Sequence, residues 1–172
     1  MKRVTLVTVA LLLLSGQVLA IPLQQAYNDA LPGAGYNRMI YLDPAETYTG
    51  GLTLADETVC ILSCGALIDL QNSRIIIEES ASLDVYGVVL TNADGAALEY
   101  QDAGHGWIDH CTFAGNYEVV YFWIGSDMML TSNIFSYSSH YGIYCHEDVN
   151  RWMAFNNAWN NTSGNYKEYC PG

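Results

Sequence analysis

The amino-acid sequence predicts an all-β protein, a single-stranded right-handed parallel β-helix (solenoid) of about six coils with a short N-terminal capping helix. Three observations predict this fold class. Large apolar residues recur every 22 to 24 residues, apolar and mixed positions alternate with a period of two around them, and glycine or asparagine falls where strands must bend. A repeat this short with that alternation excludes helical hairpins, and the general rule for parallel crossovers predicts the right-handed winding.

Length and charge restrict the domain count and the partners. The chain has 172 residues, the size of one domain, and 51% of them are hydrophobic, which is ample for a core. Its 18 acidic residues outnumber 6 basic ones, which gives a net charge of −12. Because an acidic chain is repelled by phosphate backbones and anionic lipids, we expect neither nucleic acid nor a membrane surface as a partner.

The first twenty residues have the pattern of a secretory signal peptide. Lys2 and Arg3 precede an apolar run over residues 4–14, and Ala20 ends a small-residue cleavage site. This run is shorter than the about 20 residues that a membrane span needs, so we expect no membrane insertion. The sequence therefore predicts a signal peptide over 1–20 and a secreted or cell-surface β-helix domain over 21–172. Its 4 basic and 18 acidic residues give a net charge of −14.

Residues 22–31 are predicted to form the capping helix. Leu23, Ala26, Tyr27 and Ala30 occur at positions i, i+3, i+4 and i+7, which places them on one helical face. Because the first coil of a solenoid exposes apolar interior and unpaired backbone, we expect this face to cover it.

Two columns of apolar residues define the first strand of each coil. The first column is Leu52, Ile75, Leu98, Tyr121, Ile143 and Tyr166. The second, two positions later, is Leu54, Ile77, Tyr100, Trp123 and Cys145. Strand alternation predicts that both columns face inward and that the residues between them face outward. This outward column is Thr53, Ile76, Glu99, Phe122, Tyr144 and Lys167.

Two further columns and a bend define the rest of the coil. One column is Leu67, Leu90, Phe113, Phe135 and Trp159, and the column five residues earlier is Leu62, Val85, Ile108, Leu130 and Ala154. The predicted bend between them is Gly65, Val88, Cys111, Asn133 and Asn157. Glycine and asparagine tolerate left-handed backbone there, and stacked Asn133 and Asn157 are expected to form an amide ladder.

The chain contains five cysteines, an odd number, so at least one thiol is free or paired between chains. Cys60 and Cys64 lack a second pair of ligands, so burial or a disulfide is favoured over zinc. The pairing cannot be derived from the sequence; Cys145 with Cys170 is a guess from their nearness to the C-terminal coils.

The last column is still in register when the sequence stops, and residues 167–172 do not resemble a cap. We therefore expect either a continuation of the solenoid or another chain at this end, and favour the first.

Several segments resemble a known family. The stretch from Tyr41 to Leu52 resembles the first strand of secreted bacterial right-handed β-helix proteins of the pectin-lyase-like superfamily, and residues 110–113, 133–135, 141–144 and 157–161 resemble their coil signatures. The resemblance covers about residues 22 to 170 and implies their fold. It assigns no activity, since that superfamily includes polysaccharide lyases, glycosidases and surface proteins of unknown role.

An acidic edge follows the first strand. Four positions beyond the first column lie Asp56, Glu79, Asp102, Gly125 and Glu147, and their neighbours add Glu57, Glu78, Asp127 and Asp148. Stacked carboxylates repel one another unless a cation screens them, which makes Asp56, Glu79 and Asp102 candidate Ca²⁺ ligands. A solvated ridge that keeps the protein soluble is the favoured alternative.

Catalytic residues stay unassigned. The histidines around residues 105–110, and His140 and His146, are interpreted as structural turn residues, because no nucleophile lies at a matching offset. A lyase also needs a base of lowered pKa, and the mature chain offers only Arg38, Arg74, Arg151 and Lys167 as strongly basic side chains.

Phe122 and Tyr144 are the candidate carbohydrate-binding residues, because two stacked exposed rings on a flat sheet can bind sugars. The sequence therefore favours a secreted, non-catalytic β-helix module that binds a polysaccharide or a cell-surface glycan. Two alternatives stay open: a polysaccharide lyase or glycoside hydrolase that acts through the acidic edge, and an N-terminal fragment of a longer surface protein.

Overall fold

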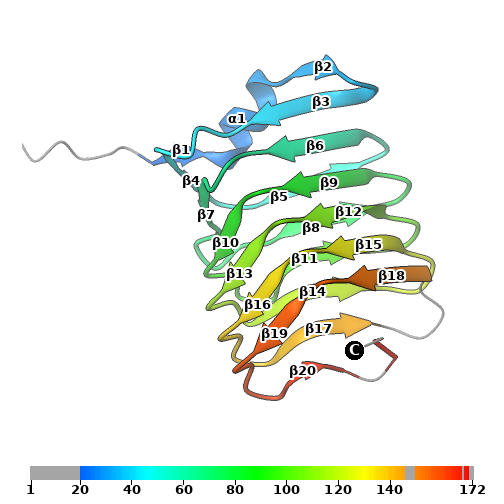
Figure 1. Cartoon of the computed structure of the whole chain (residues 1–172). Coiled ribbons are helices and arrows are strands. Elements are labelled where there is room, and N and C mark those ends of the chain that lie inside the picture. The colour runs from blue at the N-terminus through cyan, green and yellow to red at the C-terminus, as the bar shows by residue number, and fades with distance from the viewer. Residues whose placement is uncertain (1–19, 146–149, 168, 171–172) are drawn as a thin grey trace, which may run out of the picture.

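The computed structural model describes residues 20–145, 150–167, 169 and 170, so the predicted signal peptide lies outside it apart from Ala20. In this part of the chain twenty short strands form three sheets, and their coils stack from the N-terminal end downward (Figure 1). Every strand pair is parallel except β2 with β3. The predicted parallel β-solenoid of about six coils is confirmed, since one of its sheets contains six strands.

From β4 onward the strands follow one another in the order sheet A, sheet C, sheet B, so each coil contributes one strand to each sheet. Sheet A contains β1 (Ile21–Pro22), β4 (Thr47–Thr49), β7 (Leu67–Asp69), β10 (Val89–Thr91), β13 (Thr112–Ala114), β16 (Ile134–Ser136) and β19 (Asn157–Trp159). Sheet B contains β2 (Leu31–Gly33), β3 (Tyr36–Tyr41), β6 (Thr58–Leu62), β9 (Ser82–Tyr86), β12 (His105–Asp109), β15 (Asp127–Thr131) and β18 (Asn150–Ala154). Sheet C contains β5 (Leu52–Ala55), β8 (Ile75–Glu78), β11 (Ala96–Tyr100), β14 (Glu118–Phe122), β17 (Tyr141–Cys145) and β20 (Gly164–Tyr166).

The predicted capping helix is confirmed as α1 (Leu23–Asp29), which lies at the N-terminal end of the stack (Figure 1). Leu23 is fully buried, and Ala26, Tyr27 and Ala30 pack against the same core. Arg38 anchors the helix to the coils below it, since its guanidinium lies 4.3 Å above the Tyr27 ring and 3.2 Å from the carboxylate of Glu57. No helix in the described part of the chain is long and apolar enough to span a membrane.

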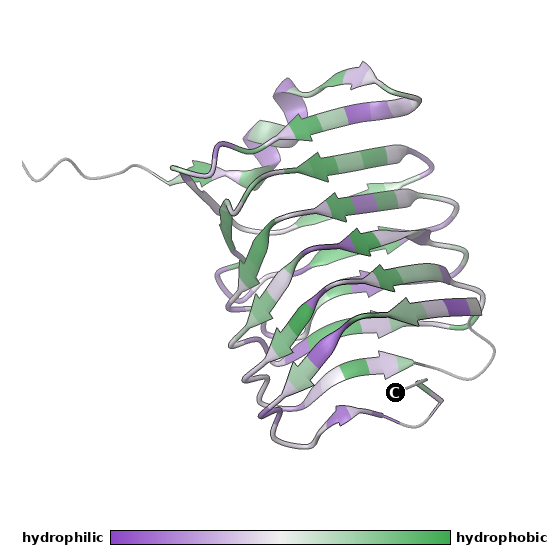
Figure 2. Cartoon of the chain, in the orientation of Figure 1, coloured by the Kyte–Doolittle hydropathy of each residue, from purple (hydrophilic) through white to green (hydrophobic). Residues whose placement is uncertain are grey.

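The interior consists of residues stacked on their equivalents one coil away. Figure 2 shows hydrophobic residues recurring at matching positions of successive strands, with hydrophilic residues beside them. In sheet C the first inward column is Leu52, Ile75, Leu98, Val120, Ile143 and Tyr166. This column agrees with the prediction in every coil but one.

The predicted register of β14 was wrong by one residue. Val120, not Tyr121, pairs with the inward residues, and Phe122 replaces Trp123 in the second inward column. Phe122 has no polar atom, is completely buried and packs on Tyr100 with ring centroids 5.8 Å apart. A one-residue slip exchanges the two faces of a strand, and the sequence could not exclude it because the four residues up to Phe122 are all apolar or aromatic.

The columns of sheets A and B are confirmed in the middle coils and shifted at the ends. The confirmed inward residues are Leu90, Phe113 and Phe135 in sheet A and Val85, Ile108 and Leu130 in sheet B. At the two ends of sheet A the inward residues are Ile68 and Ala158, where the prediction was Leu67 and Trp159. At the two ends of sheet B they are Ile61 and Met153, where the prediction was Leu62 and Ala154. At the N-terminal end the cause is turn length: residues 63–66 join β6 to β7, whereas only residues 87 and 88 join β9 to β10.

An asparagine ladder fixes the bend between sheets B and A. Asn133 Oδ1 accepts the Cys111 N–H at 2.8 Å, and Asn133 Nδ2 donates to the Ile108 carbonyl at 2.8 Å. One coil further, Asn156 Oδ1 accepts the Asn133 N–H at 3.0 Å. The ladder therefore runs through Asn156 and not through Asn157 as predicted, because the coil step is 23 residues here.

The predicted left-handed backbone in the bend column is confirmed at Gly65, with φ of 115°. In the later coils it lies one residue before the observed bend column. The residues concerned are Gly87, His110, Ser132 and Phe155, with φ between 54° and 64°. At position 87 the fold requires glycine, since a Cβ there would lie 2.3 Å from the Ser63 carbonyl oxygen.

Candidate functional site

The outer face of sheet C changes from aliphatic to aromatic along the stack. Its outward column is Thr53, Ile76, Glu99, Tyr121, Tyr144 and Lys167. The predicted outward position of Tyr144 is confirmed. That of Phe122 is wrong, since its side chain is 0% exposed, and Tyr121 stands outward in its place.

Four rings form a continuous aromatic platform on this face, consisting of Tyr121, Trp123, Tyr141 and Tyr144. The Tyr121 ring lies 4.5 Å from Tyr144 and 5.2 Å from Trp123, centroid to centroid. Tyr141 meets Tyr144 edge-on at 6.2 Å. Each ring is held by a neighbour, so the platform presents preformed aromatic surface on adjacent strands.

Lys167 adds a positive charge to the end of the platform. Its Nζ lies 3.9 Å above the Tyr144 ring and 5.5 Å from the Tyr141 ring, both within cation–π range. The hydrogen bond with the Tyr144 side chain raises the pKa of Lys167, so the amine stays charged.

A buried carboxylate orients Trp123 at the other end of the platform. Glu99 accepts hydrogen bonds from Arg74 Nη1 at 2.9 Å, Trp123 Nε1 at 3.1 Å and Gln101 Nε2 at 2.9 Å. Burial raises the pKa of Glu99, but the bonds from Arg74, Trp123 and Gln101 outweigh it and hold the pKa below its usual value. Arg74 also reaches Asp94 at 3.3 Å.

A carboxylate–histidine pair borders the platform. Glu118 Oε1 lies 2.5 Å from His140 Nδ1. The His140 ring stacks on Tyr117 at 5.1 Å and meets the edge of Tyr141 at 4.5 Å. The bond to Glu118 occupies Nδ1, so Nε2 is the nitrogen that can exchange a proton with a bound molecule. The interpretation of His140 as a structural turn residue stays a prediction. Glu118 and His140 are 22 residues apart, about one coil, and this separation is the only signal of their contact in the sequence.

The acidic edge forms the corner between sheets C and B. Asp56, Glu79, Asp102 and Gly125 occupy equivalent positions, with φ of 53°, 58°, 53° and 87°. The hydrogen bond from Ser80 lowers the pKa of Asp56, and hydrogen bonding to Asp56 raises that of Glu79. Within the described residues, no group of three histidine, cysteine or acidic side chains is arranged to hold a metal ion.

The calcium site at Asp56, Glu79 and Asp102 stays a prediction. The neighbouring acidic residues of the predicted edge do not all lie beside these three. Glu57 turns away toward Arg38, with which it forms an ion pair at 3.2 Å. Glu147, Asp148 and His146 lie outside the described residues.

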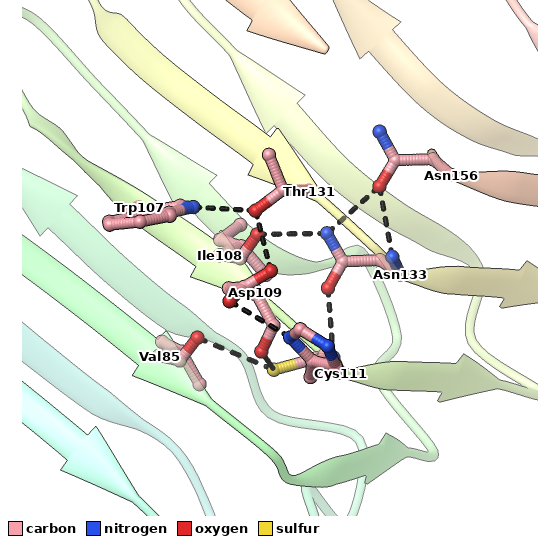
Figure 3. A network of polar contacts seen from close by, with 9 residues as sticks. Val85, Trp107, Ile108, Asp109, Cys111, Thr131, Asn133 and Asn156 are labelled. Atoms are coloured by element: carbon pink, nitrogen blue, oxygen red, sulfur yellow. Dashed lines mark hydrogen bonds and ion pairs between the residues drawn. The ribbon is translucent and has the colours of Figure 1, made fainter. Parts of the chain in front are cut away.

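The polar cluster around Asp109 connects successive coils (Figure 3). Trp107 Nε1 donates to Thr131 Oγ1 at 2.7 Å, and that hydroxyl donates to Asp109 Oδ1 at 2.5 Å. His110 Nδ1 lies 2.9 Å from Asp109 Oδ2, because left-handed backbone at His110 turns its side chain back. Asp109 and His110 therefore contact each other although they are adjacent in sequence, and Cys111 beside them is buried.

Cysteine surroundings differ along the chain. Cys60, Cys111 and Cys145 are buried, whereas Cys64 is exposed. Cys170 is half-buried against the end of the core, with its Sγ 3.6 Å from the Ile143 carbonyl oxygen and in hydrogen-bonding contact with the Cys145 thiol. Both are free thiols in this structure, so their disulfide stays a prediction.

Comparison with family models adds the deciding observation, since the model of the right-handed β-helix region matches residues 55–170. The chain belongs to this right-handed β-helix family. The match covers more than half of the chain, including all of the aromatic platform, and is consistent with the resemblance to pectin-lyase-like proteins. No curated protein matches the chain. No solved structure matches it either. For this β-helix the comparisons therefore show the fold, and the function has to be argued from the site.

Proposed function

We propose that the protein is a β-helix module that binds a glycan chain on the outer face of sheet C. The observation that carries this proposal is the aromatic platform, in which Tyr121 and Tyr144 stack across adjacent coils at 4.5 Å. Aromatic rings bind the apolar faces of sugars, and rings held in place lose little freedom on binding. Lys167 borders the platform with an ammonium group that can donate hydrogen bonds to hydroxyls, and the buried Glu99 holds Trp123 in place.

Removal of the two rings tests this proposal. The double variant Tyr121→Ala/Tyr144→Ala is expected to lose retention on immobilised plant, algal and bacterial glycans that retain the parent chain. Ile76→Ala is the matched control, because Ile76 stands in the same outward column away from the platform. Equal retention of the double variant and the parent would contradict glycan binding at this face.

The enzymatic alternative is favoured by the Glu118–His140 pair rather than by the acidic edge. The pair adjoins the platform through Tyr141, so a sugar bound there would lie next to a group able to take or give a proton. Each retained glycan would be incubated with the chain, and new reducing ends would be measured against the variant His140→Gln. Cleavage by the parent that the variant lacks supports catalysis; equal or absent cleavage opposes it.

A further inference from the structure

A hollow of about 470 Å³ lies at the corner where the turns from sheet A lead into sheet C. These turns run down one edge of the stack (Figure 1). The side chains that form its walls include Asp69, Asn72, Asn92, Asp94, Tyr117 and Tyr137. None of them belongs to the platform, but Tyr117 reaches it through His140.

The floor of this corner hollow is rigid. Asn116 is buried there, its Oδ1 accepts the Ala93 N–H at 3.0 Å, and its Nδ2 donates to the Leu90 carbonyl at 3.1 Å. On the wall, Asp69 Oδ1 accepts hydrogen bonds from Asn92 Nδ2 at 3.0 Å and from the neighbouring backbone. Polar groups that are already oriented bind a ligand at a smaller entropic cost.

Two tyrosines give the hollow aromatic walls. Tyr117 and Tyr137 are 45% and 53% exposed, which is high for side chains of this size. Each is supported from one side, Tyr117 by the stacked His140 ring and Tyr137 by Trp159 at 4.8 Å. Supported, exposed tyrosine beside amide and carboxylate groups is a combination that suits a sugar ring with its hydroxyls.

The charge of the hollow selects against acidic sugars. Among the described residues that line it are two carboxylates, Asp69 and Asp94, and no lysine, arginine or histidine. Arg74 lies nearby, but its guanidinium is shared between Asp94 and Glu99. A uronate in the hollow would meet like charge, whereas hydroxyl groups would find acceptors.

Rings connect the hollow to the platform without a break. From Tyr117 the contacts pass to His140 at 5.1 Å, to Tyr141 at 4.5 Å and to Tyr144 at 6.2 Å. We propose that the corner hollow is a second subsite, which takes an uncharged, hydroxyl-rich sugar unit of the chain that lies on the platform. This subsite rests on the proposed glycan binding. It adds to that proposal the class of sugar that is bound and the path of the glycan from the platform across the corner.

Calorimetry with neutral gluco- and manno-oligosaccharides of increasing length, and with oligogalacturonates of the same lengths, tests the subsite. Tyr137→Ala is expected to weaken binding of the longest neutral oligosaccharides three- to tenfold and to leave the shortest unchanged. Tyr41→Ala is the control, another exposed tyrosine, which lies in β3 of sheet B and does not line the hollow. Unchanged binding of long oligosaccharides by Tyr137→Ala would overturn the subsite and leave the platform standing.

A second variant tests the charge argument. Asp69→Asn keeps an oxygen that can accept the same hydrogen bonds, and is expected to raise the affinity for oligogalacturonate severalfold from a weak starting value. Parent binding of oligogalacturonate as tight as that of neutral oligosaccharides would contradict the proposed sugar class. Loss of all binding only in Tyr121→Ala/Tyr144→Ala, with Tyr137→Ala and Asp69→Asn unaffected, would confine the function to the platform and overturn the subsite.

Discussion

The early and late coils share one backbone geometry but differ in what their outer faces carry. In sheet C the early coils present Thr53 and Ile76 outward, and the late coils present Tyr121 and Tyr144 in the same column. Helix α1 covers the first coil, whereas the later coils carry most of the exposed large aromatic side chains in the described residues. Parallel pairing and the inward columns therefore determine the solenoid, and the outward column is free to acquire function.

Truncation of a stacked core ring is expected to have the largest effect. Phe135 is fully buried, and its ring lies 5.5 Å from that of Phe113 one coil earlier. Phe135→Ala should lower the free energy of unfolding by about 3–5 kcal/mol in denaturant melts. Phe155→Ala, at a side chain 88% exposed, should change it by less than about 0.5 kcal/mol. Equal losses would show that inward and outward positions of the late coils do not differ as described.

Oxidation should stabilise the late coils selectively. Glutathione disulfide is expected to convert the Cys145 and Cys170 thiols to a disulfide, with release of two glutathione thiols. Closure of a loop of this length should add about 3 kcal/mol to the unfolding free energy. Peptide mass spectrometry with differential alkylation identifies the bond, and Cys170→Ser is the control. A bond between Cys145 and another cysteine, or none, would contradict the assigned contact.

Loss of the asparagine ladder should have an intermediate effect. Asn133→Ala leaves the buried Cys111 N–H and Ile108 carbonyl without their side-chain partner, which should cost about 1–3 kcal/mol. Asn157→Ala, at the exposed position that sequence spacing had favoured, should cost less than about 0.5 kcal/mol. Denaturant melts measure the free energy of unfolding of both variants. A larger loss of stability in Asn157→Ala than in Asn133→Ala would contradict the observed ladder.

The smallest effect is expected from the charge on Glu99. Its pKa is lowered in the folded chain, so the stabilisation is present above the unfolded carboxyl pKa of about 4.3 and is lost as pH falls through the folded pKa. Glu99→Gln should therefore melt slightly below the parent at pH 7, by about 1 kcal/mol or less, and the two should converge in acid. A gap that widens as pH falls would contradict the assigned hydrogen bonds.

Sequence spacing predicted the fold well because stacked coils repeat their inward positions. Leu52, Ile75 and Leu98 stand where the coil period placed them, and α1 lies where helical spacing of apolar residues placed it. The period placed inward residues wrongly where the length of a coil changes. This happens at the turn over residues 63–66 and in the step from Leu98 to Val120.

Prediction of the candidate site depended on β14, the strand in which the alternation of apolar and polar residues did not show which side chains face outward. In β14 Tyr121 and Phe122 are both aromatic, and packing against Tyr100 decides which one is buried. The contacts of His140 with Glu118 and Tyr117 join residues about one coil apart, so they require the three-dimensional register rather than local pattern. The corner hollow has no local sequence signature, because turns from several coils form it together.

The exchange of Tyr121 and Phe122 between the two faces is tested most directly by two adjacent substitutions with two measurements. Thermal unfolding and glycan retention would be compared for Tyr121→Ser and Phe122→Ser. We predict that Tyr121→Ser melts close to the parent and loses retention, whereas Phe122→Ser loses about 3–5 kcal/mol of stability because it empties a buried position. A stable Phe122→Ser that loses retention, beside a strongly destabilised Tyr121→Ser, would place the two side chains on the opposite faces and contradict the account.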